Sequence, residues 1–439
     1  MMSPNPRPAA KSHSSWWTGR LSGKSAVMLC LVLFAQVFSA LSAAAQQAPL
    51  EDSDKQTIQL LLRRIDQLEA RVTQLESGKQ PQAAGTSVAL PSPQVSPPPA
   101  PEMPADHSEA DRMDLSKTLL RIRGFGDVTL HGDNARGDTT SFTLGQLDLF
   151  VTSDLSDKFK FLSEIVFEAG KDNVFGVDVE RYLLQYSPND FFNLSVGRYH
   201  TAIGYYNTAY HHSTWLQTAT GRPFLFEFED NGGILPIHNV GISATGLIPS
   251  GKLGLHYVAE MGNGRASHSP GAEAVQNNTD ENNGKSFNLA MYVRPEAIRG
   301  LQAGFSVYHD MLRPLGFVGI GETILAGHAV VVRSNFEWLN EALVIRHAVV
   351  GGPRTFETPG FYTQLSKRFG SYRPFVRYQY VNANNAEPVF TSLGLRHGPS
   401  VGLRFDASDS VALKVQYDFT AQRNLPSTNG LAFQVGFTF

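Results

Sequence analysis

Residues 430–439, GLAFQVGFTF, place apolar side chains at every second position. The residues between them are small or polar, as Gln434 and Thr438 illustrate. Successive side chains of a β-strand point to opposite faces of its sheet. The stretch therefore predicts a strand with one continuous apolar face, formed by Leu431, Phe433, Val435, Phe437 and Phe439.

The same alternation recurs upstream, for example in 411–419 (VALKVQYDF) and 301–309 (LQAGFSVYH). About sixteen such stretches can be counted, following the pattern of outer-membrane barrels. They are 118–131, 140–154, 157–169, 176–187, 191–200, 235–248, 251–261, 286–294, 300–311, 322–333, 337–349, 359–369, 372–382, 397–406, 409–419 and 430–439. Because no helix or second sheet is expected there to cover these apolar faces, lipid is the expected solvent. The sequence predicts an all-β fold over 118–439, a transmembrane antiparallel β-barrel of about 16 strands.

The connections between these stretches alternate in length. Short polar turns are expected at 155–157, 187–190, 249–250, 370–371 and 407–408. Longer segments fall between them, at 132–139, 201–234, 262–285, 312–321, 350–358, 383–396 and 420–429. Outer-membrane barrels have short periplasmic turns and long outer loops. A soluble β-sandwich has no reason to sort its loops in this way.

The N-terminal residues 1–45 have the pattern of a secretory signal peptide. The apolar run 25–41 is preceded by the basic residues Lys11, Arg20 and Lys24 and followed by three consecutive alanines, Ala43 to Ala45. A single transmembrane anchor is the alternative. A lipoprotein signal fits less well, because the large Leu29 precedes Cys30, the only cysteine of the chain. With the signal removed, no cysteine remains for disulfide or thiol chemistry.

Residues 46–79 predict a short α-helical coiled coil. Apolar side chains recur there at spacings of three and four, at Ile58, Leu61, Ile65, Leu68, Val72 and Leu75. So narrow a stripe is expected to pack against copies of itself, although an amphipathic helix lying on another surface is the alternative. Residues 80–117 follow as a Pro-rich linker, a semi-stiff spacer between the coiled coil and the barrel.

Strand parity directs charged side chains into the lumen. The basic ones are Arg121, Arg123, Lys160, Arg181, Arg368, Arg377, Arg404 and Lys414. The acidic ones are Asp148, Glu164, Glu168, Glu260, Asp406 and Asp418. A ring of charge of one sign would set ion selectivity. Because both signs are present and the basic residues form no unbroken ladder, the charges favour no particular solute.

The longest outer segment, 201–234, follows the fifth predicted strand, in the place of the third outer loop. In outer-membrane barrels a loop can fold into the lumen and narrow it. We therefore expect a pore constriction in this segment, with its acidic side chains facing the basic wall; the residues are Arg222, Glu227, Glu229 and Asp230. The alternative is an external loop packed on the rim of the barrel.

Other chemical signals are weak. The pair His211-His212 is a poor metal site by itself, because adjacent histidines do not share one face of a strand or helix. The glycines of 316–321 lack the βαβ context of a dinucleotide site, and there is no G-x-S-x-G elbow. We expect no cofactor and no metal. The formal net charge of −3 gives no reason to expect nucleic acid as a partner.

The chain resembles Gram-negative outer-membrane porins, and within them the phosphate-selective porin O and P type. Residues 194–204, LSVGRYHTAIG, resemble the "VGR(F/Y)…G" stretch of that group, and Phe439 resembles the terminal signal read by the outer-membrane assembly machinery. The resemblance implies a location in the outer membrane, contact with its lipid, and a water-filled channel for small hydrophilic solutes or ions, phosphate included. It also implies a homotrimer, associated through the barrel and the coiled coil.

Two other functions are weighed against a channel. A lipase-type barrel would use Ser and His on its rim, but the sequence shows no compact Ser/His/acid constellation. A gated uptake receptor would need a globular plug, for which the linker leaves no room. A structural role in tethering the envelope through the coiled coil is compatible with each of these. The sequence therefore favours a channel over an enzyme.

Overall fold

The computed structural model describes residues 120–135, 137–170, 173–210, 212–229, 232–265, 278–280, 282–314 and 318–439. The signal peptide, the coiled coil and the linker expected from the sequence all lie outside these described residues. In the part of the chain that is described, no helix is long and apolar enough to cross a membrane.

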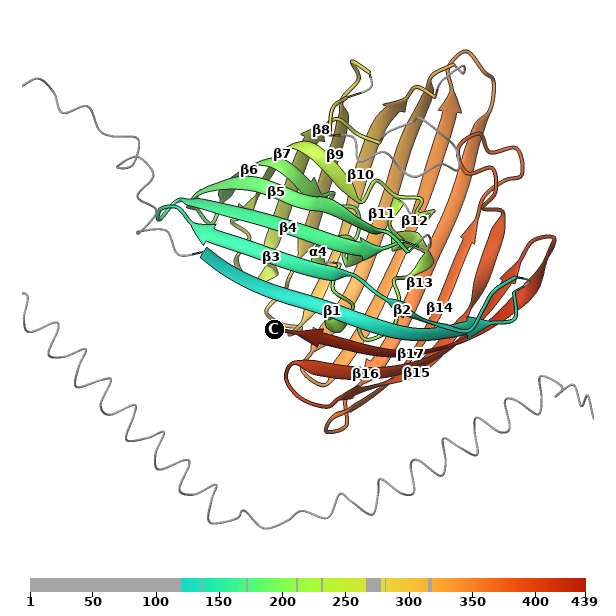
Figure 1. The fold of residues 1–439 in the computed structure, drawn as a ribbon. Coiled ribbons are helices and arrows are strands. Elements are labelled where there is room, and N and C mark those ends of the chain that lie inside the picture. The colour runs from blue at the N-terminus through green and yellow to red at the C-terminus, as the bar shows by residue number, and fades with distance from the viewer. Residues whose placement is uncertain are drawn as a thin grey trace, which may run out of the picture. The chain divides into compact units, whose positions relative to one another are not determined.

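Seventeen strands form one antiparallel sheet (Figure 1). The first eight are β1 (Leu120–Asp133), β2 (Ser141–Leu144), β3 (Leu147–Asp154), β4 (Phe159–Ala169), β5 (Phe175–Asn189), β6 (Phe192–His200), β7 (His238–Ile248) and β8 (Leu255–Gly262). The others are β9 (Ser286–Val293), β10 (Leu301–Leu312), β11 (Ile320–Arg333), β12 (Phe336–Val349), β13 (Thr355–Lys367), β14 (Tyr372–Asn382), β15 (Leu395–Asp406), β16 (Val411–Gln422) and β17 (Leu425–Thr438). Apart from the two pieces β2 and β3, each strand corresponds to one stretch predicted from the sequence.

The sheet closes on itself between its first and last strands. In Figure 1 the C-terminus lies at the end of β17, beside β1. The register pairs Phe125 with Thr438. The final residue completes the seam, because the backbone N–H of Gly124 donates to Phe439 O at 2.8 Å and that of Phe439 donates to Gly124 O at 2.9 Å. Closure pairs the backbone groups of the two end strands, which lipid could not solvate.

β2 and β3 are two parts of one pass across the barrel, since both pair with β1. The break falls at Gly145, where an added Cβ would lie only 2.0 Å from Asp127 Oδ1. Only a residue without a side chain can lie against the Asp127 carboxylate in this way. Counted by passes, the barrel has 16 strands, as the sequence predicted.

The two faces of the sheet are reversed relative to a soluble protein. On β17, Phe433 is 48% exposed, whereas the neighbouring Gln434 is 4% exposed. Every pass carries at least one exposed apolar side chain, among them Ile122, Leu147, Phe159, Leu184, Val196, Ile242, Met261, Leu289, Phe305, Leu325, Trp338, Phe361, Val376, Val401, Leu413 and Phe433. A band of outward apolar side chains around a polar interior is typical of barrels that span a bilayer. The exterior therefore faces lipid.

Some predicted boundaries are wrong at the tips of the hairpins. Residues 420–429 were expected to form a long outer loop, but β16 and β17 extend into this segment and leave only Arg423 and Asn424 between them. Asn424 has a φ of 60°, which suits a tight turn. The strands continue because backbone pairing persists past the point where the side chains stop alternating.

Candidate pore and its inward-folded loop

The long connection 201–237, between β6 and β7, packs against the inner face of strands far away in the sequence. It contains α4 (Tyr206–Ala209) and the short 3-10 helices η2 (Thr214–Leu216) and η3 (Phe224–Phe226). The Glu341 carboxylate of β12 accepts the backbone N–H of Tyr206 at 2.9 Å. The neighbouring Glu337 accepts the hydroxyl of Tyr210 at 2.9 Å. Because these carboxylates point into the barrel, the loop lies inside it.

An apolar patch on the inner wall receives the loop. The inward positions of β12 alternate carboxylates with the aliphatic Leu339, Leu343 and Ile345, all buried. They belong to one cluster with the aromatic residues of the loop, in which Tyr206 stacks on Phe226 at a centroid distance of 5.6 Å. Apolar groups in a lumen would be unfavourable if they faced water. Covering them stabilises the inward position of the loop.

Basic residues of the wall bind the backbone of the loop. Arg377 donates from Nη1 to Gly221 O at 2.9 Å, Arg404 from Nη1 to Gln217 O at 2.9 Å, and Lys414 from Nζ to Ala219 O at 2.9 Å. All three belong to the set predicted to face the lumen. Their donors are directed to loop carbonyls, so much of the predicted basic wall positions the loop.

The other predicted lumen cations lie elsewhere. The guanidinium of Arg123 lies 5.5 Å from the ring centroid of Trp215, on η2. Arg181 pairs with Glu164 at 2.5 Å in the interior. The others lie near strand ends, where Arg121 pairs with Asp154 at 2.9 Å, Arg368 pairs with Asp406 at 3.6 Å, and Lys160 is exposed near the start of β4.

The side chains expected at the constriction contact other residues of the loop or of the barrel wall. Arg222 lies over the ring of Phe228, with 4.1 Å from Cζ to the centroid. Glu227 pairs with Arg396 of β15 at 3.3 Å, and burial raises the pKa of this carboxyl while Arg396 opposes the change. Glu229 pairs with His238, at 3.4 Å from Nδ1. Asp230 lies outside the described residues.

A cavity of about 420 Å³ remains between the start of the loop and the wall of β7–β11. Its lining combines apolar and polar groups, the polar ones including Tyr205, Thr208, Glu260, Tyr292, Arg294 and His328. None of the described residues predicted for the constriction lines it. Strand parity predicts that Glu260 points inward. Which part of the wall lines the cavity depends on the side toward which the loop folds, and the sequence gives no indication of that side.

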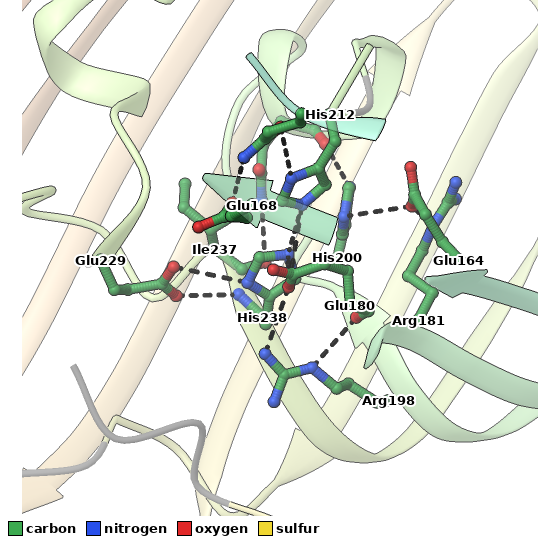
Figure 2. Close-up of polar contacts among 12 residues, drawn as sticks. Glu164, Glu168, Glu180, Arg181, Arg198, His200, His212, Glu229, Ile237 and His238 are labelled. Atoms are coloured by element: carbon green, nitrogen blue, oxygen red, sulfur yellow. Dashed lines mark hydrogen bonds and ion pairs between the residues drawn. The ribbon is translucent and has the colours of Figure 1, made fainter. Parts of the chain in front are cut away.

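Three histidines gather where the loop leaves the barrel wall (Figure 2). His200 ends β6, His238 begins β7, and the two are register partners. His212 comes from the loop between them. Burial lowers the pKa of His212 to about 3, so this imidazole is neutral at physiological pH. Sequence reasoning considered only the pair His211-His212 and missed this cluster, because its members are separated along the chain.

Glu341→Gln is expected to loosen the loop. The carboxylate accepts two backbone N–H groups and the hydroxyl of Tyr362, whereas an amide would turn an NH₂ donor toward one of these donors. Hydrogen bonds to charged groups contribute about 1.5–3 kcal/mol, so local opening should increase roughly tenfold or more. Chymotrypsin cleavage after Phe226 would report it, with the exposed Glu357→Gln as the matched control. Equal cleavage of both variants would contradict this role.

A closed barrel with an apolar exterior, a polar interior and an inward-folded third long loop defines the porin architecture. No family model matches the sequence, and no curated protein matches it. Solved structures do. The anion-selective porin from Comamonas acidovorans superposes with a TM-score of 0.54 at 13% identity, covering 73% of this chain and 100% of the porin. The Salmonella typhi OmpF complex with daunomycin gives a TM-score of 0.52 at 11% identity, covering 73% of this chain and 97% of OmpF.

A third similar structure is the in-vitro folded, trimeric form of OmpT, an outer membrane protein of Vibrio cholerae. Its TM-score is 0.50 at 11% identity, with 73% of this chain and 99% of OmpT covered. At these identities the likeness concerns the fold. The fold of residues 120–439 is therefore that of outer-membrane porins.

Proposed function

We propose that this chain forms a water-filled channel in the outer membrane of a Gram-negative bacterium, through which small hydrophilic solutes and ions diffuse passively. The observation that carries the proposal is the reversed burial of the barrel, with apolar side chains outside and polar ones inside. The inward loop then restricts the lumen to a passage beside β7–β11. Constriction by this loop sets an upper size for the solute.

Liposome swelling with the purified protein tests the proposal directly. Vesicles containing the protein should swell in small neutral sugars, and the rate should fall steeply as sugar size increases. Planar bilayers should show discrete conductance steps. Protein that is folded and inserted yet leaves vesicles impermeable to every sugar would favour the envelope-tethering role instead.

The residues of the inner wall do not favour strong selectivity for phosphate. Three cations that could have formed an anion path, Arg377, Arg404 and Lys414, bind loop carbonyls. The cavity itself combines the cationic Arg294 with the carboxylate of Glu260. We therefore propose a weak charge preference set mainly by Arg294, whose Nε donates to Gln302 Oε1 at 2.9 Å.

Arg294→Glu is expected to shift the channel toward cations. Reversing one charge in a narrow polar passage should raise the potassium-to-chloride permeability ratio roughly threefold. The zero-current potential across a KCl gradient measures this ratio. Arg299→Glu is the matched control, because Arg299 is exposed in the same turn and does not line the cavity. An unchanged potential for Arg294→Glu would mean that ions take another route.

We further propose that the chain is a homotrimer and has no enzymatic activity. One structurally similar barrel was solved in a trimer form. The polar groups of this barrel converge in its interior, whereas a lipase-type site would require them on the lipid-facing rim. We also propose that the outward side chains of β17, ending in the 68% exposed Phe439, are recognised by the outer-membrane assembly machinery. Chemical cross-linking in membranes tests the trimer.

A further inference from the structure

The histidine cluster offers ligand atoms that face one another. One ring nitrogen from each of His200, His212 and His238 lies within 4.8 Å of the other two, and all three side chains are buried. The carboxylate of Glu180, on β5, approaches two of them, with 3.0 Å from Oε2 to His238 Nε2 and 3.7 Å to His212 Nε2. Figure 2 shows this convergence at the root of the inward loop.

The outer side of each imidazole is occupied by an acceptor. His200 Nδ1 lies 3.0 Å from Asn207 O, His212 Nδ1 lies 3.2 Å from Gln146 Oε1, and His238 Nδ1 lies 3.4 Å from Glu229 Oε2. A carbonyl, an amide oxygen and a carboxylate oxygen can only accept, so each Nδ1 carries the proton. In His212 this directs the lone pair of Nε2 to the inside of the cluster, whereas His238 Nε2 faces the carboxylate of Glu180 and carries a second proton when no ion is bound. Metal-binding histidines are oriented by partners of this type.

The inner spacing fits a tetrahedral ion. His212 Nε2 and His238 Nε2 are 3.4 Å apart. Two nitrogen ligands at about 2.0–2.1 Å from a tetrahedral zinc ion are separated by about 3.3–3.4 Å. The two distances from Glu180 Oε2 bracket the same value. A cation in this gap would take the place of the proton that His238 Nε2 shares with Glu180.

The cluster lies among buried charges of both signs. Four carboxylates approach the imidazoles, namely Glu164, Glu168, Glu180 and Glu229. Arg181 pairs with Glu164, Arg198 pairs with Glu180, and Arg222 interacts with Glu229 and Glu164. Carboxylates beside imidazole ligands are suitable partners for a bound cation.

We propose that His200, His212, His238 and Glu180 bind a divalent transition-metal ion of the zinc class. Imidazole and carboxylate are suitable ligands for such an ion. The two strand-end histidines hold the base of the loop, and His212 holds a point within it. The bound ion would therefore join the loop to the barrel wall and fix the shape of the passage. The competing occupant is a proton on His238, which lies between the carboxylates of Glu180 and Glu229.

Zinc titration of the full-length protein decides between them. The purified, detergent-solubilised protein is stripped with a chelator and titrated with Zn²⁺ by calorimetry. We expect one ion per chain, and visible absorption typical of tetrahedral coordination when Co²⁺ replaces Zn²⁺. Loss of one outer-shell partner typically weakens metal binding about 10–100-fold, so loss of a direct ligand should weaken it at least about 100-fold.

The informative variants are His200→Asn and His212→Asn. The asparagine amide can take the place of the Nδ1 donor but offers no atom at the position of Nε2, so the outer hydrogen bond is retained and the ligand removed. His309→Asn and His397→Asn, on other parts of the barrel, are the controls. Heat-modifiable migration on a gel verifies that each variant is folded. Absence of zinc binding by the unchanged protein, or equal binding by the cluster variants, would overturn the site and assign the imidazoles to a proton-holding network.

Discussion

Replacing residues 213–228 with a short Gly-Ser linker is expected to raise single-channel conductance roughly two- to fivefold. A barrel of 16 strands encloses an aqueous channel when nothing fills it. Here the loop packs its aromatic residues onto the inner wall and leaves a cavity of about 420 Å³. Without this segment, water should occupy most of the lumen. Planar-bilayer recording in concentrated KCl measures the change, and the swelling assay should show a larger size limit.

The control for this experiment is an exposed loop that does not enter the barrel. Residues 350–354 connect β12 to β13 and are exposed, so replacing them should leave conductance unchanged. The loop variant must still be heat-modifiable, because the wall cations that lose their carbonyl partners are then solvated by lumen water. Unchanged conductance in a folded loop variant would show that residues 213–228 do not limit the current.

Leu325→Arg is expected to destabilise the folded barrel by about 2–4 kcal/mol, the cost of a cationic side chain near the bilayer midplane. Leu325 lies in the middle of β11 and is 44% exposed on the outer face. Its cross-strand neighbours Val307 and Val344 are apolar too. An arginine there must reach toward the headgroups or draw water into the hydrocarbon. Urea titration of folding into lipid vesicles measures the loss.

The same substitution outside the lipid should be nearly harmless. Val350→Arg places the charge just beyond the end of β12, where the cost falls to about 0–1 kcal/mol. Both variants introduce the same arginine side chain. The difference between their free energies of unfolding therefore reports the effect of depth in the bilayer. If Leu325→Arg were as stable as Val350→Arg in vesicles, this outer face would not contact hydrocarbon.

The faces of the strands were predictable because the period of a β-strand is a local property. Phe433 and Gln434 are adjacent, so their opposite environments follow from backbone geometry alone. The same parity placed Arg377 and Lys414 inside the barrel, and the alternation of short and long joints gave the number of passes. Even the break at Gly145 leaves this count unchanged, because β2 and β3 share one partner strand.

The contacts within the lumen could not be predicted from local sequence patterns. Lys414 donates to Ala219 O, 195 residues away along the chain, and nothing near either residue specifies that pairing. For the same reason the sequence predicted charged groups facing open water where the loop supplies their partners. The cavity lies between the start of the loop and β7–β11, while the rest of the loop packs onto an apolar patch that runs from β10 to β14.

The sequence by itself determined a closed, lipid-facing barrel, beginning with the alternation that ends at Phe439. It rejected a metal at His211-His212 because neighbours in sequence point apart. Only the tertiary structure brought His212 to His200 and His238, which face each other across paired strands. The physical reason is that side-chain parity repeats every two residues, whereas a binding site is assembled by strand pairing and loop folding between residues far apart in sequence.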